Sequence, residues 1–263
     1  MNTENAKCQP LLEARQIVKD YPSVKVLKNV NVSIAEGRTL AVIGPNGAGK
    51  TTLFKVLSGE VFPGSGSVFY RGENVTRAAG WKRVRAGFGR SFQVARVFKE
   101  LTAAENVLVA VEASIRNTPR ATPWRLTRDP TPVALARVEE ALAEVGLAAK
   151  SEVEARLLSH GDKKRLELAM SLVLRPAILL LDEPTAGMSP ADRKASVELI
   201  TTVRERHGMT IVMTEHDMGV VFELASDVAV LHHGEMVATG SPQEVRENEL
   251  VRRIYLGSGG GHA

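Results

Sequence analysis

The glycine-rich segment Gly44–Thr52 leaves this chain few possible folds. Its sequence, GPNGAGKTT, fills the pattern G-x-x-x-x-G-K-[ST] directly after an apolar run at 40–43, and the apolar spacing after Lys50 predicts a helix. Consecutive backbone N–H groups can surround a polyphosphate only where no Cβ intrudes, and a helix start adds the positive end of its dipole. The segment therefore predicts a strand, a phosphate-binding loop and a helix in succession. The alternative is a flexible turn that matches the pattern by chance.

Two side chains of this segment suit a bound nucleoside triphosphate. The Lys50 ammonium is a compact charge for the outer phosphates, and the Thr51 hydroxyl is suited to a Mg²⁺ ion. The residues predicted to bind the nucleotide here are Gly44, Pro45, Asn46, Gly47, Ala48, Gly49, Lys50, Thr51 and Thr52.

A second feature that fits a bound phosphate lies far downstream. The apolar run Ile178–Leu181 has the length of a buried strand and ends in two carboxylates, Asp182 and Glu183. Asp182 can hold a Mg²⁺ water or hydroxyl, and Glu183 can orient or deprotonate an attacking water. By itself such a run is more often a solvated strand end. Together with the phosphate-binding loop, it indicates nucleotide hydrolysis.

Composition fits one large α/β domain, or one domain with an appended lobe. Of 263 residues, 44% are hydrophobic and 24% charged, and the net charge of +4 is scattered rather than gathered in a polybasic tract. The single cysteine, Cys8, cannot form an internal disulfide, which fits a reducing cytosol. No run approaches the roughly 18 consecutive apolar residues of a membrane helix. Residues 1–15 also lack the apolar centre of a secretory signal, so any link to a membrane is expected to run through partner proteins.

Periodicity predicts the remaining elements. Residues 11–35 alternate apolar and polar, as half-buried antiparallel strands do, and strand and helix patterns then alternate, which indicates a central parallel sheet. The predicted strands are 40–43, 67–70, 178–181 and 210–213, and the predicted helices are 102–115, 133–145, 163–174 and 192–205. The segment 117–132 is predicted as an inserted loop and 257–263 as a frayed tail.

The segment LSHGD at 158–162 narrows the choice among GTPases, nucleotide kinases, helicases and other proteins with such a loop. It resembles the signature motif of ABC ATPases, usually L-S-G-G-Q; Ser159 and Gly161 match, whereas His160 and Asp162 depart. In that family the serine, the glycine and a helix N-terminus form an anion site for the γ-phosphate held by the other subunit. A plain N-capped helix with Ser159 as the cap is compatible with this role.

Other landmarks of the family follow in order, and the resemblance implies their roles. Gln93 matches the glutamine that contacts Mg²⁺ or water and senses the membrane partner, and His216 matches a γ-phosphate contact. Tyr21 occupies the place of the aromatic that stacks on adenine, with a plain strand tyrosine as the alternative. Ser189 stands where many members carry an aspartate. The implied catalytic residues are Glu183, His216 and Gln93, and the implied Mg²⁺ ligands are Thr51, Gln93 and Asp182.

The resemblance implies an α/β fold, a P-loop NTPase with a mainly parallel core sheet, an N-terminal antiparallel β subdomain and a helical signature subdomain. A single ABC ATPase domain is expected over 1–263, with the core and β subdomain near 10–92 and 160–240, the helical subdomain near 93–160 and a tail at 241–263. Two chains are expected to pair head to tail around two ATP molecules with Mg²⁺. Each nucleotide would lie between Gly44–Thr52 of one chain and Ser159–Gly161 of the other.

Several segments resemble one branch, the ATP-binding subunits of branched-chain (hydrophobic) amino acid importers. These segments are RSFQVARVF at 90–98, ENV at 105–107, the insertion at 117–132 and the ending at 251–257. The resemblance implies a peripheral chain on the cytoplasmic face of the inner (plasma) membrane, paired as a homodimer or with a sister ATPase. It also implies transmembrane permeases, a solute-binding protein and no nucleic acid. The permeases are expected to dock on the surface around 93–106, where Arg96, Val97 and Phe98 mix charge with apolar surface; ordinary core and rim is the alternative.

Alternatives remain open. Importers of urea or short amides resemble the chain at LSHG, and ATPases of lipopolysaccharide export share many motifs but usually lack the insertion. ABC proteins of DNA repair or translation generally carry tandem cassettes or a long coiled coil. A non-catalytic nucleotide-binding module is disfavoured by the combination of Glu183, His216 and Gln93.

Overall fold

The structure, a computed structural model, describes residues 9–22, 24–91, 95–116 and 130–257. The chain divides into two compact units. The split unit comprises Met1–Arg83 and Gly208–Ala263, and the inserted unit comprises Val84–His207. Gln93, Cys8, most of the segment predicted as an insertion and most of the tail lie outside the described residues. In the described ranges, no helix combines the length and the apolar character that crossing a membrane requires.

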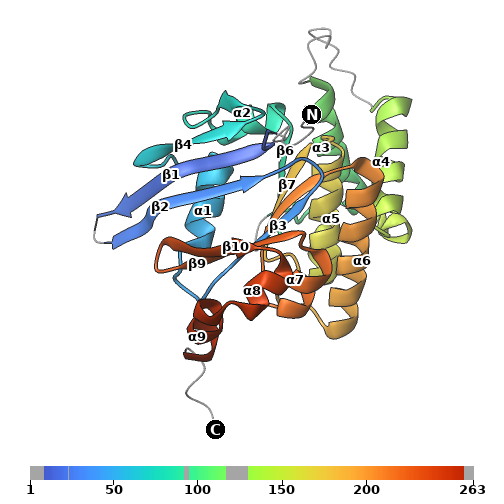
Figure 1. The fold of residues 1–263 in the computed structure, drawn as a ribbon. Coiled ribbons are helices and arrows are strands. Elements are labelled where there is room, and N and C mark those ends of the chain that lie inside the picture. The colour runs from blue at the N-terminus through green and yellow to red at the C-terminus, as the bar shows by residue number, and fades with distance from the viewer. Residues whose placement is uncertain (1–8, 23, 92–94, 117–129, 258–263) are drawn as a thin grey trace, which may run out of the picture. The chain divides into compact units, whose positions relative to one another are not determined.

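The inserted unit packs helices around a short parallel strand pair. Strand β6 (Phe88–Arg90) pairs in parallel with β7 (Ile178–Asp182), and helices α3 (Ala103–Arg116), α4 (Pro132–Glu144) and α5 (His160–Leu172) pack against one another (Figure 1). Helix α6 (Pro190–His207) packs on α5, and two short 3₁₀ turns, Ala148–Lys150 and Ala155–Leu157, lead into α5. The core contains Val107, Val111, Leu142 and Leu166. The predicted helices are thus present, with shifted ends.

Helix α5 begins three residues before the predicted Lys163. The Ser159 side chain accepts a hydrogen bond from the Asp162 N–H (3.1 Å), which makes Ser159 the N-cap and brings His160 into the first turn. Helix α6 likewise begins at Pro190, and the Ser189 hydroxyl accepts from the Asp192 N–H (3.2 Å). The first turns of α5 and α6 are mostly polar, so apolar spacing does not indicate where these two helices begin.

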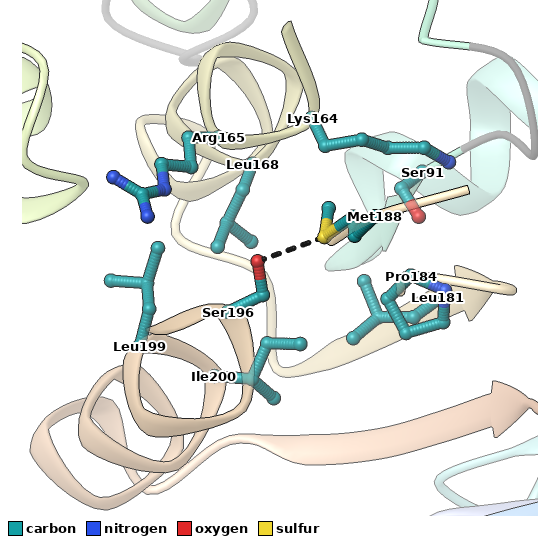
Figure 2. A pocket seen from close by; sticks show the side chains of 10 residues that line it. All are labelled: Ser91, Lys164, Arg165, Leu168, Leu181, Pro184, Met188, Ser196, Leu199 and Ile200. Atoms are coloured by element: carbon teal, nitrogen blue, oxygen red, sulfur yellow. Dashed lines mark hydrogen bonds between the residues drawn. The ribbon is translucent and has the colours of Figure 1, made fainter. Parts of the chain in front are cut away.

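A small cavity of about 30 Å³ lies inside this unit between α5, α6 and the turn that follows β7 (Figure 2). Its wall is mostly apolar, and its few polar groups include the Ser196 hydroxyl, which lies 3.2 Å from the Met188 sulfur. The lining residues are Ser91, Lys164, Arg165, Leu168, Leu181, Pro184, Met188, Ser196, Leu199 and Ile200. A space of this size holds about one water molecule, so it is a packing defect rather than a substrate pocket.

The split unit contains an antiparallel sheet in the order β2-β1-β4-β5. Its strands are β1 (Leu12–Tyr21), β2 (Val24–Ile34), β4 (Ser65–Tyr70) and β5 (Glu73–Asn74). The pairing of β1 with β2 confirms the antiparallel strands predicted for residues 11–35. Between Ala14 and Ile17 the register shifts, and the Asn31 side chain accepts the Gln16 N–H at 2.9 Å in place of a ladder bond.

The split unit also contains strands in the order β10-β9-β3-β8. Strand β3 (Thr39–Ile43) is parallel to both β8 (Thr210–Thr214) and β9 (Asp227–His232), and β10 (Glu235–Gly240) runs antiparallel to β9. Val42 pairs with Thr214, and Ile43 pairs with Val230. The segments that follow these three parallel strands therefore leave the sheet at one edge, where ligands of α/β proteins bind. Neither β9 nor β10 was predicted.

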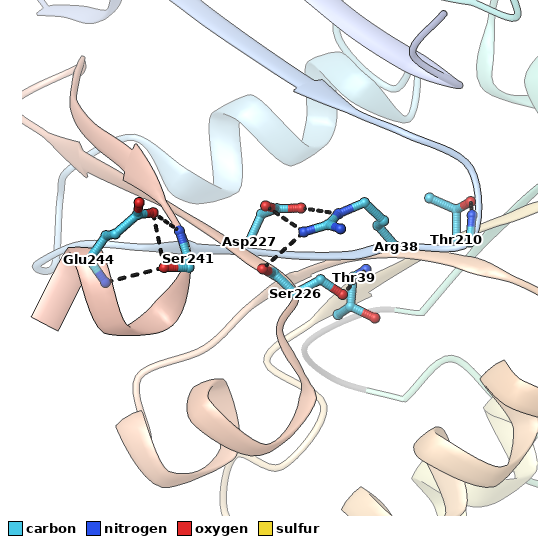
Figure 3. A network of polar contacts seen from close by, with 8 residues as sticks. Arg38, Thr39, Thr210, Ser226, Asp227, Ser241 and Glu244 are labelled. Atoms are coloured by element: carbon cyan, nitrogen blue, oxygen red, sulfur yellow. Dashed lines mark hydrogen bonds and ion pairs between the residues drawn. The ribbon is translucent and has the colours of Figure 1, made fainter. Parts of the chain in front are cut away.

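Polar contacts fix the opposite ends of the same strands (Figure 3). Both carboxylate oxygens of Asp227 accept hydrogen bonds from the Arg38 guanidinium, at 2.6 and 2.9 Å, and the Ser226 hydroxyl accepts the Thr39 N–H at 3.2 Å. The Thr210 hydroxyl accepts the Gly37 N–H at 2.8 Å. A two-pronged arginine–carboxylate pair has a defined geometry. These contacts hold β3, β8 and β9 in register and so align their carboxyl ends.

Short helices cover the split unit. Helix α1 (Lys50–Leu57) follows β3, α2 (Gly80–Arg85) precedes β6, and α7 (Met218–Leu224) follows β8. Helix α8 (Pro242–Glu247) begins with a capping box between Ser241 and Glu244 (Figure 3), and α9 (Glu249–Gly257) packs on α8 and β10. Arg83 is 1% exposed and donates to carbonyls in the last turn of α1.

Candidate nucleotide-binding and hydrolysis site

The loop between β3 and α1 has the backbone that a phosphate cradle requires. Gly44, Gly47 and Gly49 all have positive φ, at 151°, 77° and 107°. A Cβ on Gly44 would lie 2.0 Å from the Leu231 carbonyl oxygen, and one on Gly49 would lie 3.0 Å from the Val26 carbonyl oxygen. A side chain is therefore excluded at Gly44 by neighbouring backbone and is crowded at Gly49, whereas at Gly47 only the dihedral angle demands glycine.

Lys50 is buried and is held inside this loop. Its ammonium donates to the carbonyl oxygens of Gly44 at 2.6 Å and Pro45 at 3.1 Å. Helix α1 has no side-chain cap at Gly49 and no acidic residue in its first turn. No acidic residue of its own first turn competes for its first N–H groups, which together with the Lys50 charge suit an anion. The Thr51 hydroxyl lies on the exposed side of the same turn.

His216 follows β8 at the same sheet edge as the loop, because Thr214 pairs with Val42. The buried Glu215 carboxylate accepts the His216 N–H at 3.0 Å, and the Asp217 carboxylate caps α7 by accepting the Gly219 N–H at 2.8 Å. These bonds fix the backbone on both sides of His216, whose side chain is exposed. The parallel register therefore brings the predicted histidine and the predicted loop to one edge.

Tyr21 ends β1 in the same unit. Its side chain is 43% exposed, and the Lys19 ammonium lies 5.4 Å from the centre of its ring. A ring exposed to this extent has a π-face on which a flat ligand can stack. Its contact with adenine stays a prediction.

In the inserted unit, Asp182 and Glu183 lie at the carboxyl end of β7, as predicted. Asp182 is buried, and Glu183 has a φ of 51°. A non-glycine residue in the left-handed region is strained by about 1 kcal/mol, and such strain gathers at functional sites. The backbone thus turns sharply at Glu183, the residue predicted to orient or deprotonate the attacking water.

The start of α5 contains an ion pair that the sequence did not reveal. The Asp162 carboxylate accepts from the Lys150 ammonium at 2.6 Å and from the Ser159 hydroxyl at 2.8 Å. Burial opposes the charge, but these two bonds hold the pKa of Asp162 below its usual value. Lys150 therefore neutralises the carboxylate that stands in place of the usual glutamine.

His160 and Ser189, two departures from the family pattern, contact the turn after β7 or the start of α6. A ring nitrogen of His160 lies 3.2 Å from the Ala186 carbonyl oxygen, and Ser189 donates to the Asp192 carboxylate at 2.7 Å. A Cβ on Gly161 would lie 3.8 Å from Asp192. The signature segment and the turn after β7 are therefore in direct contact within this unit.

Three features define an ATP-binding cassette. They are a phosphate-binding loop after a parallel strand, a second strand that ends in two carboxylates, and a serine-capped helix that lies between these two in the sequence. Residues 27–186 match the family model described as ABC transporter, and the chain belongs to this family of ATPases. Residues 235–260 match a second model, described as branched-chain amino acid ATP-binding cassette transporter. Both matches confirm the family expected from the sequence.

Several relatives span nearly the whole chain. This chain is 35% identical to the high-affinity branched-chain amino acid transport ATP-binding protein LivG of Escherichia coli (strain K12), over 95% of this chain and 98% of LivG. The protein of the same description from Pseudomonas aeruginosa, BraF, is 35% identical over the same shares. The lipopolysaccharide export system ATP-binding protein LptB of Acidithiobacillus ferridurans is 34% identical, over 94% of this chain and 97% of LptB.

Among solved structures, the ADP conformation of MJ1267, an ATP-binding cassette of an ABC transporter, superposes with a TM-score of 0.82. It is 25% identical, and the match covers 94% of this chain and 99% of that one. This likeness confirms the predicted α/β fold of an ABC ATPase.

Proposed function

We propose that this chain is the ATP-hydrolysing subunit of an importer for branched-chain or other hydrophobic amino acids. The observation that carries the cargo class is the match of 235–260 to the branched-chain cassette model, in a chain whose relatives LivG and BraF bear that description. LptB is similar to nearly the same degree, so lipopolysaccharide export is the rival to be tested, together with urea or short-amide import.

Residues of the split unit would bind the phosphates and the base of the nucleotide. Lys50 and the N–H groups of Gly44–Thr52 would hold the phosphates, and Tyr21 would stack on adenine. Lys50 lies within 3.1 Å of two loop carbonyls, so its charge is already placed where the phosphates would lie. His216, at the same sheet edge, would contact the γ-phosphate.

Mg²⁺ usually binds through one or two protein oxygens together with phosphate oxygens, and it neutralises charge on the phosphates. The exposed Thr51 hydroxyl and the Asp182 carboxylate are ligands of this kind. Gln93, the third proposed ligand, lies outside the described residues. Glu183 would accept a proton from the attacking water. Its left-handed backbone conformation sets the direction in which its side chain leaves the main chain.

The proposed pairing with a second chain depends on Ser159 and Gly161. Both lie at the start of α5, where the helix dipole favours an anion. Lys150 neutralises Asp162, so the negative charge three residues after the cap does not oppose a phosphate at full strength. The partner is a second copy or a sister ATPase, in head-to-tail arrangement, as the resemblance implies.

The permease would dock on exposed apolar residues of the inserted unit. Phe98 is 51% exposed and Leu157 is 67% exposed. Their loops are joined, because the Arg156 N–H donates to the Lys99 carbonyl at 3.0 Å. The buried Asn106 side chain accepts the Phe98 N–H at 2.8 Å and donates to the Phe98 carbonyl at 3.0 Å. A rigid loop that presents an exposed phenyl ring suits an apolar partner surface.

The docking proposal is tested by purifying the tagged chain from membranes of the source organism and measuring the yield of any permease that co-purifies. Phe98→Ala and Leu157→Ala should weaken the complex, whereas Val133→Ala, which alters a residue that is 68% exposed at the start of α4, should not. Equal yields of the complex in all three variants would contradict the proposal that Phe98 and Leu157 form the docking surface.

The cargo is tested by uptake into cells of the source organism that carry either the wild-type chain or Lys50→Met. Labelled leucine uptake should fall in the variant while urea uptake is unchanged. Loss of urea uptake with normal leucine uptake would favour the amide branch. Lipopolysaccharide retained in the inner membrane, with both uptakes normal, would favour the export branch.

A further inference from the structure

The turn between β9 and β10 is bonded to the phosphate-binding loop. The Gly234 N–H donates to the Ala48 carbonyl oxygen at 3.0 Å, and the Gly234 carbonyl accepts the Lys28 N–H of β2 at 2.8 Å. All three residues belong to the split unit, and Gly234 is buried. One residue of the turn therefore joins the loop to the antiparallel sheet through both of its backbone groups.

The bond to Ala48 fixes one peptide plane of the loop. In a trans peptide the carbonyl and the following N–H point in opposite directions. Because the Ala48 carbonyl points to the turn, the Gly49 N–H points away from it. The Gly234 N–H thus sets the direction of a group that the proposed function assigns to the phosphates.

The turn and the loop also pack against the same carbonyl of β2. A Cβ on Gly234 would lie 2.4 Å from the Val26 carbonyl oxygen, and one on Gly49 would lie 3.0 Å from the same oxygen. The first of these distances is too short for any side chain, so a larger residue at 234 would have to displace the turn. Such a displacement would pull the Gly234 N–H out of line with Ala48.

Two residues connect β9 to β10, and both have positive φ. The φ of His233 is 47° and that of Gly234 is 82°, and His232 pairs with Glu235 across the turn. A two-residue hairpin turn of type I′ requires positive φ at both positions, which favours asparagine followed by glycine. Histidine also adopts positive φ more readily than most residues, whereas a β-branched residue does so rarely. The place of the Gly234 N–H thus depends on residues that tolerate these angles.

We propose that Gly234 is a positioning residue for nucleotide binding, and that the β9–β10 turn sets the geometry of the phosphate-binding loop at Ala48 and Gly49. The inference rests on the proposed function, because the loop that the turn positions is the one that would hold the phosphates. The turn itself is assigned no contact with the nucleotide. Its effect passes through the Ala48 carbonyl, so a change in the turn should alter nucleotide affinity rather than the chemistry of hydrolysis.

The first test compares two glycines of positive φ by calorimetric titration of the full-length chain with ADP. This nucleotide lacks the γ-phosphate on which the proposed pairing depends, so the titration reports on one chain. Gly234→Ala should raise the Kd for ADP roughly three- to tenfold, the range expected for one net hydrogen bond. Gly208→Ala is the matched control. The φ of Gly208 is 60°, but nothing lies within 4 Å of an added Cβ, so the Kd should be unchanged.

A pair of variants at His233 keeps the test decisive if Gly234→Ala does not fold. The His233 side chain is exposed, and His233→Val and His233→Asn both remove its ring, whose centre lies 4.1 Å from that of His232. Valine resists positive φ, whereas asparagine accepts it. His233→Val should therefore raise the Kd for ADP, by a smaller factor than Gly234→Ala, and His233→Asn should bind ADP as the wild type does. Equal Kd values in this pair would contradict a role of the turn backbone.

Steady-state ATP hydrolysis supplies the second readout. Gly234→Ala and His233→Val should raise the KM for ATP by factors similar to those in Kd while kcat stays within about twofold, because the loss acts on ground-state binding. An unchanged Kd and KM, even with a lowered melting temperature of the nucleotide-free chain, would overturn the inference, as would an equal rise in Gly208→Ala. The proposed function fails separately, if Lys50→Met binds ADP as well as the wild type does.

Discussion

The Lys50 ammonium lies 2.6 Å from the carbonyl oxygen of Gly44, so the one charged residue of the segment Gly44–Thr52 is bonded to its first glycine. This bond closes the loop into a ring around a buried positive charge. A neutral carbonyl satisfies an ammonium less well than an anion does. The ring is therefore preorganised for phosphate, and changes at its members should act on nucleotide binding before they act on the fold.

Lys50→Met should keep the fold and lose the nucleotide. Methionine retains much of the apolar stem but removes the charge, so we expect kcat/KM for ATP hydrolysis to fall by roughly a hundredfold or more. Lys55→Met, in the last turn of the same helix, is the control and should hydrolyse ATP normally. Hydrolysis at the wild-type rate in Lys50→Met would contradict the assignment of this loop to the nucleotide site.

Glu183→Gln should bind ATP but hydrolyse little. The amide has the same shape and the same strained backbone, yet it cannot accept the proton of the attacking water, so kcat should fall by roughly a hundredfold to ten-thousandfold. Size-exclusion chromatography with ATP and Mg²⁺ should show the paired form accumulating. Turnover equal to that of the wild type would show that another group is the base.

Asp162→Asn should remove a pH-dependent part of stability. The pKa of Asp162 is lowered in the folded chain, so its contribution is present above the usual value of 3.8 and is lost as the pH falls through the lowered pKa. Because Lys150 is half exposed, we expect a cost of no more than about 1 kcal/mol at pH 7. Urea unfolding should show this difference at pH 7 and a smaller one at pH 3. A difference that grows on acidification would contradict the ion pair.

Arg83→Met should destabilise the split unit strongly. The guanidinium donates to carbonyls of Val56 at 2.9 Å, Val75 at 2.8 Å and Ala78 at 3.1 Å, and its removal leaves buried acceptors without these donors. We expect a loss of about 3 kcal/mol in the free energy of unfolding, measured by urea titration. Arg77→Met, at an exposed position, should stay within about 0.5 kcal/mol of the wild type. Equal stabilities would show that the carbonyls find other partners.

The sequence alone determined the elements whose signals are local. The glycine pattern at Gly44–Thr52 predicted a strand, loop and helix, and β3, the loop and α1 follow in that order. The apolar run before Asp182 predicted β7, and the alternation at 11–35 predicted an antiparallel pair. Each of these signals lies within a few residues, because burial on one face or in a strand imposes a short period on the chain.

Only the tertiary structure decided which distant residues meet. The bond of Lys150 to Asp162 and the insertion of Arg83 beneath the end of α1 join segments that no periodicity relates. Strands β9 and β10 also escaped prediction, although β9 is the parallel neighbour of β3. A residue's own neighbourhood in sequence fixes whether it is buried, but its hydrogen-bond partner depends on how the elements pack. The sequence therefore predicted the phosphate-binding loop, and the packed structure showed that Lys50 binds the loop carbonyls and that the Leu231 backbone lies against Gly44.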